Sequence, residues 1–398
     1  MEMKKYKLGD IGEVRMCKRI LKEETNTVSG VPFFKIGTFG NVADVFITRE
    51  KFEEYKAKYS YPKKGDVLIS AAGTIGRTVV YNGEDAYYQD SNIVWIENDE
   101  SKVVNSLLYY AYKNVKWKVS NGSTILRLYN DDLRRTEIFV PADISVQKKI
   151  ASILSTLDKR IENLRAQNRV LEQTAKTIYD YTFLQCAGYQ TTYNKTLNRN
   201  IPTNWEVKKL SDVADILSGG TPKTARQDFW NGDIPWLSVK DFNIESTYVL
   251  KSERNITKLG LDNCAATLLE ENDIVMSARG TVGVMTMVPY AMTFNQSCFG
   301  FHAKDIPGNS PYFLYYTLKT TVNELVAGSH GSVFNTISRD DLGRVNVAFP
   351  DSQSLDKFNA QVEPIFKKQL VNTKQIETLT TQRNTLLPLL MTGQVMVL

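Results

Sequence analysis

Residues 65–76 read Gly-Asp-Val-Leu-Ile-Ser-Ala-Ala-Gly-Thr-Ile-Gly, and residues 272–283 read Asn-Asp-Ile-Val-Met-Ser-Ala-Arg-Gly-Thr-Val-Gly. One match of this kind would mean little, but several in the same order along the chain indicate a duplication with a period of roughly 200 residues. The weaker matches pair residues 6–11 with 208–213, 31–34 with 234–237, 108–110 with 314–316, 131–133 with 340–342, and Pro141 with Pro350.

Each copy begins with a mixed part and ends with a helical part. In the mixed part, Gly, Pro and Asn separate short apolar runs such as Val67-Leu68-Ile69, which are typical of strands and turns. We therefore predict an α+β fold in which two duplicated β-rich α/β domains are separated by two long helices that form an antiparallel coiled coil. The predicted boundaries are 1–145 for the first domain, 146–187 for the central helix, 188–351 for the second domain and 352–398 for the C-terminal helix.

The two helical parts carry apolar residues at alternating spacings of four and three, which is a heptad pattern. Asn168 is a polar member of the first pattern, and Pro364 either kinks the second helix or marks its start. Each amphipathic helix needs a partner, and we expect that partner to be the other helix rather than its own domain. The predicted pairing residues are Ile150, Leu154, Leu157, Ile161, Leu164, Leu171, Ile178, Phe358, Val362, Ile365, Ile376, Leu379, Leu386 and Leu390.

Composition narrows the class of protein. A length of 398 residues with 42% apolar content suits two or three cored domains, and the net charge of +5 neither favours nor excludes nucleic acid. No apolar run approaches the roughly 18 residues of a membrane span, and residues 1–8 lack the apolar core of a signal peptide. We therefore expect a cytoplasmic protein that does not enter a membrane. Four scattered cysteines and two histidines predict neither disulfides nor a metal site.

The sequence lacks the common catalytic motifs. It contains no G-x-x-x-x-G-K-[ST], no G-x-G-x-x-G after a strand, no H-E-x-x-H and no G-x-S-x-G. Histidine-based catalysis would depend on His302, which we interpret as an ordinary strand residue, or on His330 in a polar loop. We therefore expect a chain that is not an enzyme by itself and that holds no cofactor.

The repeated loops are the best candidates for a binding site. In the first loop pair, Thr74, Arg77, Arg279 and Thr281 surround tight glycine turns, and arginine suits bidentate contact with guanine. A plain hairpin is the alternative. A second, polar loop pair supplies Ser123, Thr124, Arg127, His330, Ser332 and Asn335, of which asparagine suits adenine and the hydroxyls suit phosphate or base edges.

Basic residues near these loops would supply phosphate contacts if the partner is DNA. Many surface lysines and arginines only keep a protein in solution, so each one also has this simpler interpretation. The candidates are Lys63, Lys64, Lys116, Lys118, Lys223, Arg226, Lys240 and Arg254.

Three further stretches carry a resemblance to a known family. They are Ile-Pro-Thr-Asn-Trp-Glu-Val-Lys-Lys-Leu at 201–210, Leu-Ser-Gly-Gly-Thr-Pro at 217–222 and Arg-Asn-Thr-Leu-Leu-Pro-Leu-Leu-Met-Thr-Gly-Gln-Val at 383–395. With the duplicated layout, the whole chain resembles the specificity subunit of type I restriction–modification systems, called HsdS. The central helix departs from the pattern, because residues 178–183 replace the Leu-Pro-Leu-Leu-Met-Thr-Gly ending, so the two helices are not expected to contact their partners identically.

The resemblance implies that each domain is a target-recognition domain that reads one half of a bipartite sequence in double-stranded DNA. It implies that the paired helices set the gap between the halves and dock two methyltransferase subunits, through which restriction/motor subunits join. S-adenosylmethionine, ATP and Mg would then belong to those partner subunits.

Three alternatives remain open from the sequence. The chain can be the specificity subunit of a related system whose restriction and modification activities share one fused partner. It can be a coiled-coil adaptor that binds proteins without reading DNA. It can also be a one-chain nuclease or methyltransferase, although the missing cofactor motifs count against this.

Overall fold

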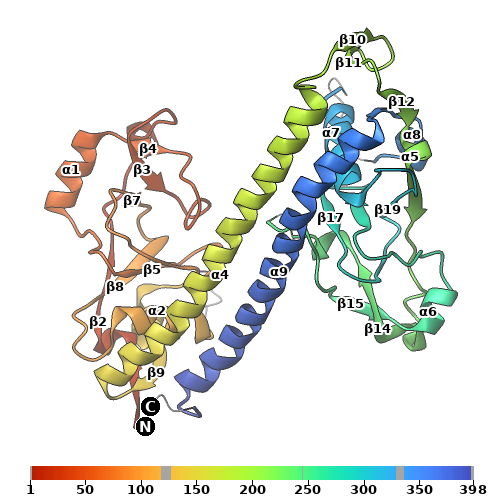
Figure 1. The fold of residues 1–398 in the computed structure, drawn as a ribbon. Helices are drawn as coiled ribbons and strands as arrows, with labels where there is room; N and C mark the ends of the chain where they lie inside the picture. Colours follow the sequence, from red (N-terminus) through yellow and green to blue (C-terminus); the bar gives the residue numbers. More distant parts are fainter. Residues whose placement is uncertain (1, 118–126, 244, 329–335, 396–398) are drawn as a thin grey trace. The chain divides into compact units, whose positions relative to one another are not determined.

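The computed structural model describes residues 2–117, 127–243, 245–328 and 336–395. Its contacts divide the chain into two compact units, which are described separately below. Unit 1 comprises Met1–Lys159 with Leu379–Leu398, and unit 2 comprises Arg160–Thr378. Both long helices, α4 (Ile144–Tyr179) and α9 (Ser352–Met391), contribute to both units (Figure 1). The predicted boundaries of the domains stay predictions.

Unit 1 is built from three small sheets and short helices. Its elements are β1 (Met3–Lys7), β2 (Gly12–Met16), β3 (Val31–Phe34), β4 (Phe46–Ile47), α1 (Arg49–Lys58), β5 (Val67–Ser70), β6 (Thr78–Val80), β7 (Tyr87–Tyr88), β8 (Ile93–Asn98), α2 (Asn105–Asn114), α3 (Asn130–Arg135) and β9 (Glu137–Pro141). The sheets have the strand orders β2-β8-β5-β6, β4-β3-β7 and β1-β9. All pairs are antiparallel except β3 with β7.

Unit 2 repeats this topology strand for strand. Its elements are β10 (Thr191–Asn194), β11 (Arg199–Pro202), β12 (Glu206–Lys209), α5 (Leu210–Val213), β13 (Ala214–Ser218), β14 (Trp230–Leu237), β15 (Arg254–Ile256), α6 (Lys258–Asp262), β16 (Ile274–Ser277), β17 (Met285–Met287), β18 (Thr293–Phe294), β19 (Cys298–Ala303), α7 (Pro311–Gly328), α8 (Arg339–Gly343) and β20 (Asn346–Phe349). The orders β13-β19-β16-β17, β15-β14-β18 and β12-β20 match those of unit 1, with the hairpin β10-β11 added. The predicted duplication is confirmed.

The central strands are apolar on both faces because each separates two cores. In β5, Val67 and Ile69 join one buried cluster while Leu68 joins the other. In β16, Ile274 and Val275 divide in the same way. Since alternate strand residues point to opposite faces, a continuous apolar run is what such a strand requires.

Helices α4 and α9 pair in antiparallel orientation. In unit 1 the beginning of α4, with Leu154, shares a core with Leu386 and Leu390 near the end of α9. In unit 2 the end of α4, with Tyr179, shares a core with Phe358 near the beginning of α9. The predicted antiparallel coiled coil is confirmed, and each helix also covers its own domain. All the predicted pairing residues are buried or half-buried.

The helix bounds settle how Pro364 is accommodated. Helix α9 begins at Ser352 and continues past Pro364, so this proline does not mark the start of the helix. Helix α4 ends at Tyr179 and is followed by one π-helical turn, Asp180–Leu184.

A layer of buried polar side chains interrupts the apolar seam within unit 2. Asn168, Gln369 and Asn372 are 5%, 1% and 0% exposed. The Asn372 Nδ2 donates to Asn168 Oδ1 over 3.0 Å, and Asn168 Nδ2 donates to Thr373 Oγ1 over 3.2 Å. Because these bonds form at only one axial alignment of the helices, the layer fixes the register of the pair.

Asn168→Ala is expected to lower the free energy of unfolding of the full chain by about 1–3 kcal/mol, because it leaves the Asn372 amide short of a buried partner. The double variant Asn168→Leu/Asn372→Leu is expected to lose less than the single one, since it removes both partners. Urea unfolding followed by circular dichroism measures both. A double variant that loses more than Asn168→Ala would contradict the role given to the layer.

Candidate nucleic-acid interface

The loop between β5 and β6 (residues 70–77) is organised by a buried serine hydroxyl. Ser70 is 1% exposed, and its Oγ donates to the Thr74 carbonyl over 2.5 Å. The same Oγ accepts the Arg77 amide over 2.9 Å. Gly73 and Gly76 have φ angles of 63° and 83°, a region that favours glycine. The serine therefore holds a tight turn from inside and leaves the Thr74 side chain exposed.

The loop between β16 and β17 (residues 277–284) repeats this construction in unit 2. The Ser277 Oγ donates to the Thr281 carbonyl over 2.5 Å and accepts the Val284 amide over 3.0 Å. Gly280 and Gly283 have φ angles of 74° and 87°. Both loops connect antiparallel neighbours, so the glycine turns lie between two paired strands.

Several predicted residues of unit 1 meet at the β5–β6 loop. Arg127 forms an isolated β-bridge with Ala72, and its Nη2 donates to the Ser91 carbonyl over 2.8 Å. The Arg77 Nη1 donates to the Phe39 carbonyl over 2.8 Å. Each guanidinium is thus held by a backbone carbonyl, Arg77 by that of Phe39 and Arg127 by that of Ser91.

The predicted phosphate-contact lysines of unit 1 divide into two groups by their position relative to the β5–β6 loop. Lys116 is exposed and adjoins Trp117, whose indole lies against Gly76 in the β5–β6 loop. Lys63 and Lys64 are exposed but precede β5, whereas the loop follows it. The Lys63 ammonium lies 3.6 Å from the Glu97 carboxylate. The structure therefore brings Thr74, Arg77, Lys116 and Arg127 together and leaves Lys63 and Lys64 at the other end of the strand.

In unit 2, three predicted basic residues gather around Trp230. The Trp230 indole donates to the Lys223 carbonyl over 3.3 Å, and the Arg254 guanidinium lies 3.5 Å from the centre of the Trp230 ring. Arg226 binds Asp228 through two hydrogen bonds of 2.9 and 2.6 Å, which offset its charge. Arg254 is therefore the basic group of this cluster whose charge is held over an aromatic face rather than by a carboxylate.

The other predicted residues of unit 2 belong to other segments of the chain. Arg279 and Thr281 are exposed on the β16–β17 loop, where Arg279 forms a β-bridge with Thr336. Lys240 is exposed on the 3₁₀ turn Val239–Asp241. The remaining predictions lie outside the described residues; they are Lys118, Ser123, Thr124, His330, Ser332 and Asn335.

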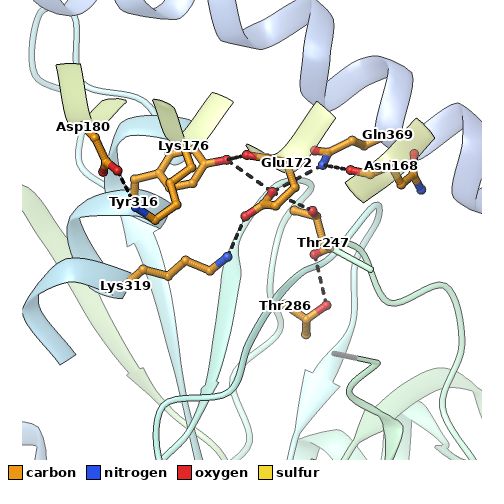
Figure 2. A network of polar contacts seen from close by, with 9 residues as sticks. All are labelled: Asn168, Glu172, Lys176, Asp180, Thr247, Thr286, Tyr316, Lys319 and Gln369. Carbon is orange, nitrogen blue, oxygen red and sulfur yellow. Dashed lines mark hydrogen bonds and ion pairs between the residues drawn. The ribbon is translucent and has the colours of Figure 1, made fainter. Parts of the chain in front are cut away.

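A polar network that sequence reasoning missed joins the second domain to α4 (Figure 2). The Lys319 ammonium of α7 donates to Glu172 Oε1 over 2.7 Å, and Tyr316 Oη donates to Glu172 Oε2 over 3.2 Å. Thr247 and Gln369 donate to the same Oε2 over 3.2 and 3.3 Å. Burial acts to lower the pKa of Lys319, but Tyr315 and Glu172 together outweigh it and raise this pKa above its usual value.

Unit 1 has a comparable anchor on α4. The Asp158 carboxylate accepts Tyr110 Oη over 2.9 Å and Arg383 Nη1 over 2.7 Å, and Lys113 lies 4.0 Å away. In each unit a tyrosine and a lysine three residues apart on one helix reach a carboxylate of α4. The sequence signal for these two anchors is the repeated Tyr-x-x-Lys at 110–113 and 316–319. The carboxylates that they bind lie at different positions of α4, so matching the two repeats could not predict them.

Two negative findings apply to the described residues. Among them, no group of three or more His, Cys, Asp or Glu side chains is arranged to hold a metal ion. None of the helices in this part of the chain has the length and apolarity to cross a membrane.

Comparisons with known proteins define the class. A family model described as "Type I restriction modification DNA specificity domain" matches residues 1–173 and again 202–382. The chain therefore belongs to the type I restriction–modification DNA specificity family, as the resemblance of its motifs predicted. The two matched segments correspond to the two copies of the repeat.

Individual relatives agree with this assignment. The chain is 27% identical to the type I restriction enzyme MjaIX specificity subunit of Methanocaldococcus jannaschii over 98% of this chain and 93% of that one. It is 51% identical over 181 residues, about half of each chain, to a putative type I specificity subunit of Haemophilus influenzae, S.HindORF215P. The crystal structure of an S subunit from M. genitalium shares the fold, with a TM-score of 0.62 at 16% identity over 98% of this chain and 96% of that one.

The glycines of the β16–β17 loop give a matched test of its geometry. A Cβ on Gly283 would lie 2.8 Å from Val322 Cγ1, whereas a Cβ on Gly280 would meet open space. Gly280→Ala is expected to cost about 1 kcal/mol from its positive φ alone, and Gly283→Ala about 2–3 kcal/mol because a clash is added. Urea unfolding of the full chain measures both losses. Equal losses would contradict the packing described for Gly283.

Proposed function

We propose that this chain is the sequence-reading, non-catalytic subunit of a type I restriction–modification complex, and that each recognition domain reads one half of a bipartite target in double-stranded DNA. The observation that carries the proposal is the complete duplication of one fold, including the β5–β6 and β16–β17 loops. Two copies of one recognition fold can each bind their own half-site. In this proposal the recognition domains are residues 1–145 and 188–351.

The helices 146–187 and 352–398 would hold the two domains at a set separation. Two features support this role. The polar layer around Asn168 and Asn372 gives the helix pair one axial alignment. The carboxylates of Asp158 and Glu172 attach a recognition domain to α4 within each unit. A helix pair of fixed register that binds one domain in each unit is suited to setting a spacer between two half-sites.

The chemistry of the complex would belong to other chains. In this proposal two methyltransferase subunits dock on the helices and use S-adenosylmethionine, and restriction/motor subunits that use ATP and Mg join through them in the cytoplasm. The exposed faces of the helices, which carry residues such as Val170 and Val371 at 66% and 46% exposure, are available for such docking.

The two half-sites are expected to differ in sequence. Unit 1 presents Arg77 and Arg127 beside its loop, whereas unit 2 has Val284 where unit 1 has Arg77 and adds Arg254 over Trp230. Because base recognition depends on the side chains that reach base edges, unlike sets of arginines favour unlike targets.

Methylation-sensitive sequencing of DNA from cells with and without the gene tests the proposal. We expect a modified target made of two short, different half-sites separated by a fixed non-specific gap. Exchange of residues 188–351 for the same domain of another specificity subunit is expected to change one half-site and leave the other. A single continuous target would contradict the proposal that each domain reads its own half-site. An unchanged target after the exchange would favour a protein adaptor that does not read DNA.

A further inference from the structure

We infer that Glu172 is a positioning residue for target recognition: it fixes the second recognition domain, and with it the β16–β17 hairpin, on α4, and thereby restricts the gap that the complex accepts between the two half-sites. This role rests on the proposed function. Glu172 itself is assigned no contact with DNA.

The Glu172 carboxylate receives four donors from three separate segments of unit 2 (Figure 2). From α7, Lys319 donates to Oε1 over 2.7 Å and Tyr316 donates to Oε2 over 3.2 Å. Thr247, between β14 and β15, donates to Oε2 over 3.2 Å, and Gln369 of α9 does so over 3.3 Å. Tyr316 and Gln369 are 1% exposed and Thr247 is 7% exposed, so water competes little for these bonds. One carboxylate therefore holds the domain, α4 and α9 in one arrangement.

Thr247 continues this network into the β16–β17 hairpin. Its carbonyl accepts the Met287 amide over 2.8 Å and the Thr286 hydroxyl over 3.2 Å. Both residues belong to β17, the strand that follows the β16–β17 loop. Tyr248 forms a parallel β-bridge with Met287, so the segment runs along the edge of β17. Glu172 thus reaches, through Thr247, the strand that carries the candidate recognition loop.

The anchor of the first domain is built from helices. Asp158 accepts Tyr110 of α2 and Arg383 of α9, and it lies 4.0 Å from the Lys113 ammonium of α2. In unit 2 the corresponding tyrosine and lysine of α7 are joined on Glu172 by Thr247, whose segment pairs with a sheet. We therefore expect loss of Glu172 to change the position of the second domain and to leave the base preferences of both domains unchanged.

The lengths of these hydrogen bonds explain why the network would restrict the gap. One added base pair moves a half-site by about 3.4 Å along the DNA axis. A domain that followed this movement would break bonds that exist only at donor–acceptor distances of about 2.7–3.2 Å. The apolar contacts between the domain and the helices are not directional and tolerate sliding better. With Glu172 in place the domain cannot follow the displaced half-site, and without it the apolar contacts remain to hold a shifted domain.

The test uses the full chain assembled with its methyltransferase partner and DNA in which the half-sites are separated by the natural gap or by one base pair less or more. The ratio of dissociation constants for altered and natural gaps measures the preference. Glu172→Gln removes the charge at similar size and is expected to reduce this preference about tenfold, and Thr247→Val, which removes one donor, about threefold. Glu162→Gln, at an exposed glutamate of α4, is the matched control and is expected to keep the full preference.

The outcomes separate this inference from the proposed function. Full preference for the natural gap in both Glu172→Gln and Thr247→Val overturns the inference, while a bipartite target still supports the proposed function. Binding that falls equally at all three gaps assigns Glu172 to fold stability alone and also overturns the inference. An unchanged complex without a bipartite target overturns the proposed function itself. If thermal unfolding shows that Glu172→Gln does not fold, Thr247→Val decides, because it keeps the ion pair of Glu172 with Lys319.

Discussion

The hydrogen bond between Asn168 and Asn372 is the contact on which the arrangement of α4 and α9 depends. Apolar heptads alone allow two helices to slide by a turn with little loss of buried area. A buried amide pair does not, because any other register breaks the hydrogen bond between Asn372 and Asn168 inside the seam. The neighbouring Gln369 extends this layer to Glu172, so the register of the helices and the position of the second domain are coupled within unit 2.

The anchors on α4 give the duplicated domains different attachments. Tyr110 and Lys113 reach Asp158, whereas Tyr316 and Lys319 reach Glu172, although the tyrosine and lysine occupy matching positions of the repeat. The second domain thus binds the helix that precedes it as well as the helix that follows it.

The candidate interface was partly predictable. The two glycine turns were found because their residues recur as a contiguous motif, and each turn connects two antiparallel strands. The orientation of Arg77 and Arg127 was not found, because the carbonyls that hold them belong to Phe39 and Ser91, which no pattern in the sequence connects to the loop. The stacking of Arg254 on Trp230 likewise depends on how β15 aligns with β14. The contacts of these residues with DNA stay predictions.

The sequence by itself determined the duplication and the two heptad helices, because repeats, apolar periodicity and glycine turns are local patterns that survive without knowledge of the fold. The class of specificity protein came from the resemblance of three further stretches to a known family. Only the tertiary structure decided which polar groups meet. Lys319 and Glu172 are 147 positions apart, and Asn372 and Asn168 are 204 apart. A periodic pattern says which face of a helix is buried, but a hydrogen bond needs two atoms within about 3 Å. That proximity follows only from the packing of whole elements.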